Sequence, residues 1–226
     1  MRYIVNNPDV ILELLREHLV MVSSALVVAV LIALPLSLFL TRVPRLATTV
    51  IGVLGILYTI PSIALLILLL PIFGLNQRTV IVALVIYTQI ILVRNMVAGL
   101  KGVPVVMLEA ARGMGMNGWQ RWWQVQLPLA LPVILAGVRL ALIVAIAIAT
   151  IGAKFGAGGL GTLLFDGIAQ NRYDKIWAGA LIVAGLALLV NYLLLALENY
   201  FTIEKRIGRM AQRQPRPTGH TSPGMA

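Results

Sequence analysis

The sequence has no cysteine, only two histidines and only eight acidic residues among 226. Without cysteine, neither a disulfide framework nor a thiolate metal site is possible. The spans described below contain no paired carboxylates, and the chain has neither an H-E-x-x-H motif nor the phosphate-binding motif G-x-x-x-x-G-K-[ST]. We therefore expect a non-catalytic chain that binds no metal or cofactor and does not hydrolyse ATP by itself.

Charged residues are also scarce, at 12% of the chain, whereas 60% of residues are hydrophobic and stand in long blocks. As a helix, each block is long enough to cross a hydrocarbon core of roughly 30 Å. Helices are required because an unpaired backbone group in lipid is strongly destabilising. The sequence thus predicts an all-α integral membrane protein with about five transmembrane helices. They cover residues 19–40, 48–72, 79–100, 130–152 and 177–200.

The net charge of +10 comes from Lys and Arg at the ends of these blocks and in the tail. No basic face with interleaved aromatic residues is visible, so we expect no nucleic-acid partner. Ten Lys and Arg residues stand on one side of the five spans and six on the other. The positive-inside bias places the amino terminus outside and the carboxyl terminus in the cytoplasm. The ten are Arg42, Arg45, Lys101, Arg112, Arg121, Lys205, Arg206, Arg209, Arg213 and Arg216.

The two ends of the chain differ from the apolar centre. Residues 1–18 are predicted to form an external amphipathic segment, and their acidic residues argue against a removable signal peptide. Residues 19–205 form the predicted transmembrane domain. Residues 206–226 lack apolar periodicity and are predicted to be a disordered cytoplasmic tail. The apolar side of the first segment would comprise Ile4, Val10, Ile11, Leu14 and Leu15.

Residues 105–126 lie between two spans and are too polar to cross a membrane. Pro104 can start a helix and Gly115 can end it. A second short helix would then run up to the next span, which gives a helix–turn–helix. The spacing that stands out in this region comprises Glu109, Ala110, Ala111, Gly115, Val125, Leu127 and Pro128.

Each part of this loop has an expected role. Glu109 would accept hydrogen bonds near a helix start, and Ala110 and Ala111 would permit close approach to another surface. One side of the first helix would be lined by Val105, Val106, Leu108 and Ala111. The tryptophans at positions 119, 122 and 123 would anchor the loop at the lipid interface.

The spacing from Glu109 to Pro128 resembles the EAA loop of ABC importer permeases, which docks onto a cytoplasmic ATPase. Further stretches resemble the permeases of osmoprotectant importers for glycine betaine, carnitine or choline, and the resemblance covers roughly residues 15–205. These stretches are residues 18–36, 59–62, 93–95, 113–116, 131–139 and 156–161.

The resemblance implies a type I importer permease fold in a bacterial-type inner membrane. It also implies a second permease subunit, identical or paralogous, two ATPase subunits that use ATP and Mg²⁺, and an external solute-binding protein. The main alternative is an importer for methionine or another small solute. A secondary transporter driven by an ion gradient is a weaker one, because the spans carry almost no ionisable groups. A membrane enzyme is weaker still.

Polar residues in the second and third spans are candidates for a translocation pathway, although hydrogen bonding between helices explains them equally well. They are Tyr58, Thr59, Ser62, Thr88 and Gln89. Pro61 is expected to kink the second span. Arg94 and Arg139 are interpreted as helix-orienting or interface groups, and Asn191 and Glu198 as packing and interface residues.

Four glycines after the fourth span are candidates for an outer gate or for close packing. Three of them match the dinucleotide fingerprint G-x-G-x-x-G, but no strand is expected before them, so this match is interpreted as coincidental. The four are Gly156, Gly158, Gly159 and Gly161.

Overall fold

Long apolar helices make up most of residues 2–201, which the computed structural model describes. No strand occurs in this range, so the predicted all-α fold is confirmed. The predicted tail, residues 206–226, lies outside the described residues. The long helices are α2 (Pro8–Arg42), α3 (Pro44–Thr59), α5 (Gln77–Lys101), α8 (Leu127–Gly152) and α10 (Tyr173–Phe201). The short elements are α1 (Arg2–Asn6), α4 (Ser62–Phe73), α6 (Val105–Gly113), α7 (Gly118–Arg121), the π-helical turn η1 (Trp122–Gln126), the 3-10 turn η2 (Ala153–Phe155) and α9 (Gly161–Ala169).

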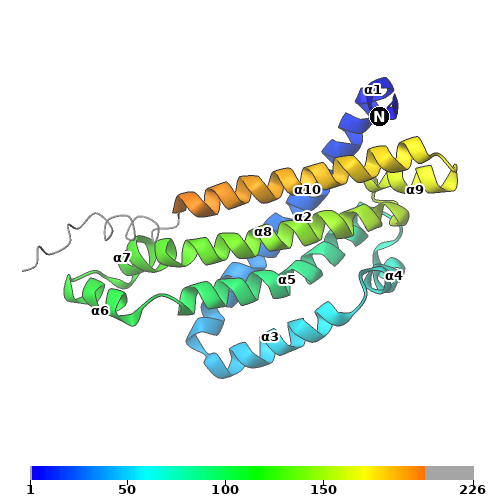
Figure 1. Ribbon diagram of the computed structural model, residues 1–226. Coiled ribbons are helices and arrows are strands. Elements are labelled where there is room, and N and C mark those ends of the chain that lie inside the picture. The colour runs from blue at the N-terminus through cyan, green and yellow to red at the C-terminus, as the bar shows by residue number, and fades with distance from the viewer. Residues whose placement is uncertain (1, 202–226) are drawn as a thin grey trace, which may run out of the picture.

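The central helix of the bundle is α5, which packs against α2, α3, α4 and α8 (Figure 1). Its buried side chains belong to two apolar clusters, one towards each end of the bundle. The helices approach closely where small residues face α5: a Cβ at Gly137 of α8 would lie 2.5 Å from the Cβ of Asn95. In Figure 1, α3 and α10 lie at opposite edges, and α10 packs on α8 and α9.

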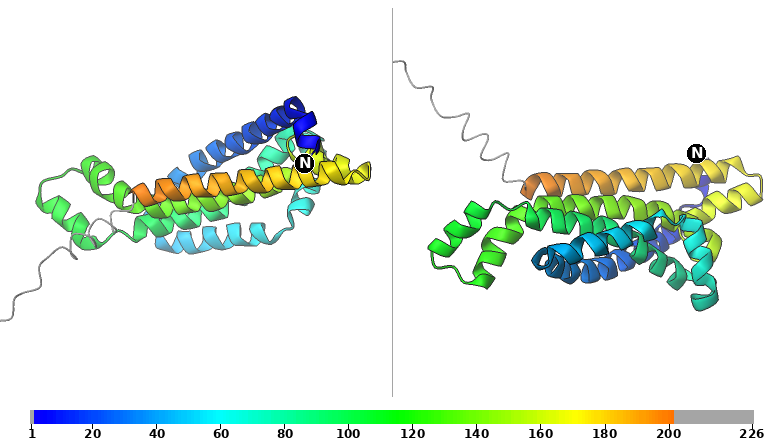
Figure 2. Two further views of the ribbon diagram at one scale, coloured as in Figure 1. Left: turned by 45° about the horizontal axis from the view of Figure 1, so that its top comes forward. Right: turned by 90° about the horizontal axis from the view of Figure 1, so that it is seen from below.

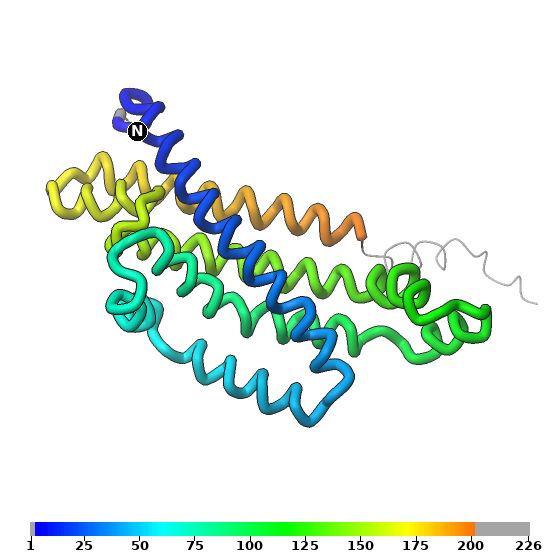
Figure 3. The backbone as a smooth tube through the Cα atoms, turned by 180° about the vertical axis from the view of Figure 1, so that it is seen from behind, coloured from blue at the N-terminus to red at the C-terminus, as the bar shows by residue number. Residues whose placement is uncertain are grey.

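The first span is longer than predicted. Helix α2 begins at Pro8 and continues without a break to Arg42, so residues 8–18 are not a separate amphipathic helix. Proline is favoured at a first helical position, and residues 9–34 contain no glycine or proline that would end the helix. Figure 3 shows α2 crossing the bundle obliquely, with its amino-terminal part reaching beyond it.

Part of the predicted apolar side of the amino-terminal segment, including Ile4, Ile11 and Leu14, contacts protein, whereas Val10 is exposed. Tyr3 is buried in a small cluster with Leu163 of α9 and Ala178 of α10, and Ile11 packs against this cluster. Arg172 and Lys175 lie over the Tyr3 ring, at 5.4 Å and 5.6 Å from its centroid. These contacts tie α1 and the start of α2 to the α9–α10 connection.

The second predicted span, residues 48–72, is two helices. α3 and α4 meet at an angle of 93°. Pro61 has no N–H and disfavours helical geometry in the residue before it, and Ile60 accordingly has an extended backbone with ψ 126°. The Tyr87 hydroxyl donates a hydrogen bond to the Ile60 carbonyl, which the break frees from the helix. The expected kink is therefore a sharp corner.

The other three predicted spans correspond to α5, α8 and α10, each of which begins two to four residues earlier than expected. Four helices of the described chain are long and apolar enough to cross a membrane, and α3 with α4 would provide a fifth crossing. The short elements gather at the two ends of these helices. In Figure 2, α6 and α7 project beyond the end where α10 finishes, whereas α9 lies at the other end.

Candidate functional site

The loop at residues 105–126 has the predicted helix–turn–helix shape. α6 follows Pro104, and the chain turns at Gly115, whose φ of +78° is a left-handed conformation that favours glycine. The Gly115 N–H donates to Arg112 O at 2.9 Å, and the Met116 N–H donates to Ala111 O at 3.1 Å. These bonds satisfy carbonyls at the end of α6 and hold the turn in one geometry.

A capping box that we did not predict fixes the start of α7. The Gln120 N–H donates to Asn117 Oδ1 at 2.8 Å, and the Asn117 N–H donates to Gln120 Oε1 at 2.9 Å. The sequence signal was present, because a capping residue followed three positions later by Gln is typical of a helix start. Both sides of the turn are therefore locally defined.

The first helix of this loop presents two different faces. Ala111 is buried and Leu108 packs against the bundle core, whereas Val105 and Val106 are exposed. The prediction that these four line one side is wrong, because Val106 lies almost opposite Leu108 and Ala111 at 100° per residue. The exposed apolar residues of α6 and the turn after it are Val105, Val106, Met107 and Met114, with exposed fractions of 66%, 73%, 47% and 70%.

The other residues of the motif separate in the same way. Glu109 and Ala110 are exposed, whereas Val125, Leu127 and Pro128 are half-buried. Glu109 lies four residues after the first residue of α6, and within residues 2–201 its carboxylate accepts no hydrogen bond. Its predicted capping role is therefore wrong.

The three tryptophans do not act as one group. Trp122 packs against the bundle core, whereas Trp119 and Trp123 are exposed and contact each other edge to face, with ring centroids 5.5 Å apart. Anchoring at the lipid interface stays a prediction for this exposed pair.

The five candidate pathway residues have different surroundings. Thr88 and Gln89 are buried between helices, where Thr88 Oγ1 donates to Leu84 O at 2.8 Å and Gln89 Nε2 donates to Ala29 O at 3.1 Å. Thr59 Oγ1 donates to Ile56 O at 2.7 Å within its own helix. Ser62 is half-buried at the start of α4. Of the five, Tyr58 alone lines the cavity described next.

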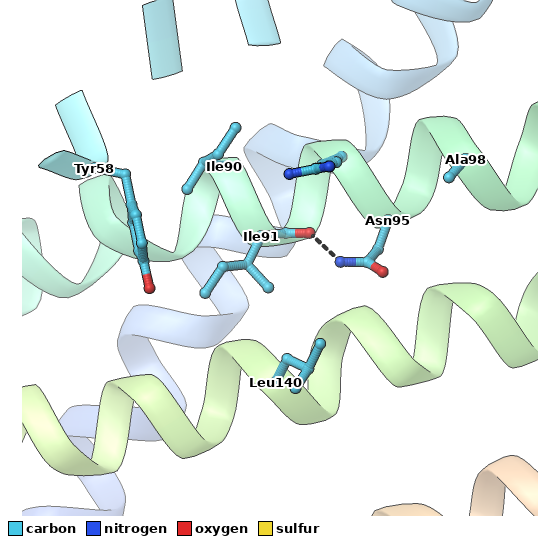
Figure 4. A pocket seen from close by; sticks show the side chains of 7 residues that line it. Tyr58, Ile90, Ile91, Asn95, Ala98 and Leu140 are labelled. Atoms are coloured by element: carbon cyan, nitrogen blue, oxygen red, sulfur yellow. Dashed lines mark hydrogen bonds between the residues drawn. The ribbon is translucent and has the colours of Figure 1, made fainter. Parts of the chain in front are cut away.

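That cavity is an open groove of about 380 Å³ between α3, α5 and α8 (Figure 4). Tyr58, 42% exposed, comes from α3, and its ring lies 5.7 Å from that of Tyr87. Asn95 Nδ2 donates to Ile91 O at 2.8 Å on the same wall. Arg94, interpreted from the sequence as a helix-orienting group, is exposed in the groove. The other lining residues are Ile90, Ile91, Asn95, Ala98 and Leu140.

The four glycines lie at the end of the bundle opposite α6 and α7. Gly156, Gly158 and Gly159 all have positive φ, and the Gly159 N–H donates to Glu17 Oε2 at 2.8 Å. Gly159 also packs on the buried His18. The loop is thus closely fitted against α2, in agreement with the packing interpretation, and helix α8 precedes it. A gating role stays a prediction.

An ion pair joins α8 to α10. Arg139 Nη2 lies 3.2 Å from Glu198 Oε2, and Arg139 Nη1 donates to Asn191 Oδ1 at 3.2 Å. Each side chain of the pair is 22% exposed. Arg139 is therefore stabilised within an apolar helix by a partner 59 positions later in the sequence.

Together, the membrane-length helices, the groove between them and the helix–turn–helix at one end define a membrane transport subunit. The chain belongs to the family described as the inner membrane component of binding-protein-dependent transport systems, whose model matches residues 25–203.

Curated relatives match along most of the chain. The carnitine transport permease protein OpuCB of Listeria monocytogenes is 40% identical over 186 residues, which are 82% of this chain and 85% of the relative. The glycine betaine/carnitine/choline transport system permease protein OpuCB of Bacillus subtilis is 37% identical over 202 residues, 89% and 93% of the two chains. The osmoprotectant import permease protein OsmW of Salmonella typhimurium is 38% identical, with 88% and 95% covered.

Solved structures share the fold. An inward-facing structure of the MetNI methionine ABC transporter matches with a TM-score of 0.74 and 24% identity, over 85% of this chain and 96% of that chain. An amino acid ABC transporter crystallised with histidines matches with a TM-score of 0.66 and 20% identity, over 88% and 95% of the two chains. The predicted ABC importer permease fold is confirmed.

Proposed function

We propose that this chain is the permease subunit of an ATP-driven importer for quaternary-ammonium osmoprotectants such as glycine betaine, carnitine and choline. The observation that carries this proposal is the 37–40% identity, over 82–89% of the chain, to permeases whose names state these solutes. The likeness to a methionine transporter, at 24% identity, concerns the fold alone. Methionine, the main alternative expected from the sequence, stays the second candidate cargo.

The proposed assembly contains a second permease subunit, identical or paralogous, two cytoplasmic ABC ATPases and an external solute-binding protein. The ATPases use ATP and Mg²⁺, and this chain binds no cofactor. Closure of the ATPases would displace the two α6–α7 loops and reorient the helices around the pathway, which is alternating access. Solute would be captured first by the binding protein.

The exposed residues of α6 and its turn support contact with an ATPase. Val105, Val106, Met107 and Met114 are exposed apolar residues of the segment that projects beyond the membrane-length helices in Figure 2. Exposed apolar residues among polar ones are typical of interaction sites, and Glu109 and Arg112 of α6 are also exposed. The fixed geometry at Gly115 and Asn117 would let a displacement of the ATPase reach α5 and α8.

Charge supports an orientation with α6 and α7 in the cytoplasm. The sequence has ten Lys and Arg residues on the α6–α7 side of the spans and six on the α9 side. Five of the ten, Arg42, Arg45, Lys101, Arg112 and Arg121, are described residues at this end of the bundle, and the other five follow residue 201 in the sequence. The basic residues of the α9 side are partly offset by acidic ones. By the positive-inside bias, the α9 end would lie outside and the α6–α7 end in the cytoplasm. The family match supports the inner membrane of a bacterial-type cell as the location. The acidic residues of the α9 end are Asp9, Glu13, Glu17, Asp166 and Asp174.

Uptake measurements test the proposed cargo. The complete transporter is supplied in a strain that lacks other importers for these solutes, and uptake of labelled glycine betaine, carnitine, choline and methionine is compared. We expect uptake of at least one quaternary-ammonium solute, dependent on the ATPase and on the binding protein. Methionine uptake without any quaternary-ammonium uptake would reject the cargo and leave the permease assignment intact.

A further inference from the structure

The guanidinium of Arg94 is the one formal charge in the groove described above. Within residues 2–201 it forms no ion pair and no hydrogen bond, in contrast to Arg139, which is held by Glu198 and Asn191. None of the described carboxylates lines the groove. They belong to Asp9, Glu13, Glu17, Glu109, Asp166, Asp174 and Glu198.

An arginine at this depth favours an anionic partner. Arg94 lies seven residues before the end of α5, about 10 Å from that end at 1.5 Å per residue. A charge in an apolar span is costly unless it pairs or reaches water. Guanidinium binds carboxylates through two parallel hydrogen bonds, and such charge-assisted bonds are stronger than neutral ones.

The rest of the groove suits the other end of a zwitterion. Tyr58 leaves 42% of its surface exposed, and an aromatic face attracts a quaternary ammonium group. Ile90, Ile91 and Leu140 offer an apolar wall for its methyl groups. In Figure 4, Tyr58 lies beside Ile90 and Ile91. Arg94 follows Ile90 by four residues of α5, about 6 Å along the helix axis. The groove is therefore lined by an aromatic ring beside Ile90 and by a guanidinium about one helical turn further along α5.

We propose that Arg94 binds the carboxylate of a zwitterionic quaternary-ammonium solute in this groove, so that the pathway favours betaines over the carboxylate-free cation choline. The inference rests on the proposed function and specifies which solutes the permease prefers. Choline would have its charge repelled by Arg94 and would offer the guanidinium no anion. The preference would add to any selection by the binding protein.

The test compares variants with the same binding protein and ATPase, so that a change in preference reports the permease. Initial uptake rates of glycine betaine and choline are measured for the wild type, Arg94→Gln, Arg94→Lys and Asn95→Asp, with the amount in the membrane followed by immunoblot. Arg78→Gln is the matched control, since Arg78 is also an exposed arginine of α5 but does not line the groove.

We expect Arg94→Gln to lower the ratio of betaine to choline uptake by about tenfold or more, because a charged hydrogen-bonding partner is lost. Asn95→Asp should shift the ratio in the same direction by placing a competing carboxylate beside Arg94. Arg94→Lys should give a ratio between those of the wild type and Arg94→Gln, because it keeps the charge but loses the paired hydrogen bonds of the guanidinium. Arg78→Gln should leave the ratio unchanged. A ratio that falls through new choline uptake supports the proposal equally well.

An unchanged ratio of betaine to choline uptake in Arg94→Gln or in Asn95→Asp, at normal amounts in the membrane, overturns the role of Arg94. If one of these two variants does not reach the membrane, the other decides. A wild-type transporter that moves no quaternary-ammonium solute refutes the proposed function and this inference with it. Wild-type uptake with unchanged variants refutes the inference alone.

Discussion

At Gly161, a hydrogen in place of a methyl group lets α9 begin directly against the end of α8. A Cβ there would lie 2.0 Å from the Thr150 carbonyl oxygen and 2.9 Å from the Ala153 Cβ. The obstructing oxygen belongs to the backbone of α8, so no side-chain rotation can remove the clash. The close contact at Gly161 thus fixes where α9 begins relative to the backbone of α8.

We expect Gly161→Ala to destabilise the protein by about 1–3 kcal/mol, the usual range for overpacking. Gly185→Ala in α10 is the control, because a Cβ there meets nothing within 4 Å. It should be neutral or slightly stabilising, since alanine is the better helix former. Thermal unfolding of the purified protein in detergent measures both, and equal stability of the two variants would contradict the packing described.

The contact partners of side chains in the site could not be predicted from the sequence. Thr88 and Gln89 are polar, as residues of a pathway would be, but the face of α5 that packs against protein depends on the rotation of the helix in the bundle. That rotation is set by contacts with α2 and α8, which are distant in sequence. Arg94 and Arg139 looked alike in sequence for the same reason, although only Arg139 has an acidic partner.

Among the structural elements, the α6–α7 loop depends on one turn. Gly115 has φ +78°, whereas Gly113 at the end of α6 has an ordinary helical backbone, and a Cβ at either position meets nothing within 4 Å. The two glycines therefore differ in backbone conformation and not in available space.

Gly115→Ala should reduce transport and binding-protein-stimulated ATP hydrolysis in the complete transporter, whereas Gly113→Ala should preserve both. An alanine in the left-handed region is strained by about 1–2 kcal/mol, and relief of that strain would move α6 relative to α7. The assay compares stimulated with basal hydrolysis at equal amounts of assembled transporter. Equal stimulation in both variants would show that the turn geometry does not matter for coupling.

The contact between α8 and α10 offers a second test at this scale. Arg139→Gln and Glu198→Gln should each destabilise the protein, and a double-mutant cycle should give a coupling energy of about 0.5–3 kcal/mol. Leaving one charge without its partner in an apolar span is the physical reason. Thermal unfolding in detergent gives the four free energies, and strictly additive single effects would argue against a functional pair.

Most elements were predictable from the sequence because long apolar blocks, Pro104 and Gly115 act locally. The bounds of α2 and α4 instead depend on contacts between residues that are distant in the sequence. Nothing in composition separates residues 8–18 from a surface helix, because their packing on α9 and α10 is a tertiary contact. Pro61 predicts a break, but the 93° corner also involves the hydrogen bond from Tyr87, 27 residues away.

For the whole molecule, the central prediction concerns orientation. The native chain has no cysteine, so single cysteines can be labelled without background. Leu75 and Met114 are a matched pair at opposite ends of the bundle, exposed by 67% and 70%. An impermeant thiol reagent applied to intact cells should label Leu75→Cys and not Met114→Cys.

Permeabilised cells that lack the ATPase are the control for that experiment, because the partner would otherwise cover position 114. Both positions should then be labelled. Labelling of Met114→Cys alone in intact cells would contradict the proposed topology and indicate the opposite orientation.

The corner at Pro61 ends α3 and therefore sets the length of the helix that faces the membrane at the α3 edge of the bundle. With 16 residues, α3 is roughly 24 Å long, whereas α2 with 35 residues is about 52 Å long. A hydrocarbon core of roughly 30 Å matches neither helix. The excess length of α2 lies in its charged first part, which reaches beyond the bundle. Beside α3, the bilayer would thin, or α4 or another protein would replace the lipid. The thickness of the surrounding membrane should therefore influence how readily this edge is covered by a second subunit.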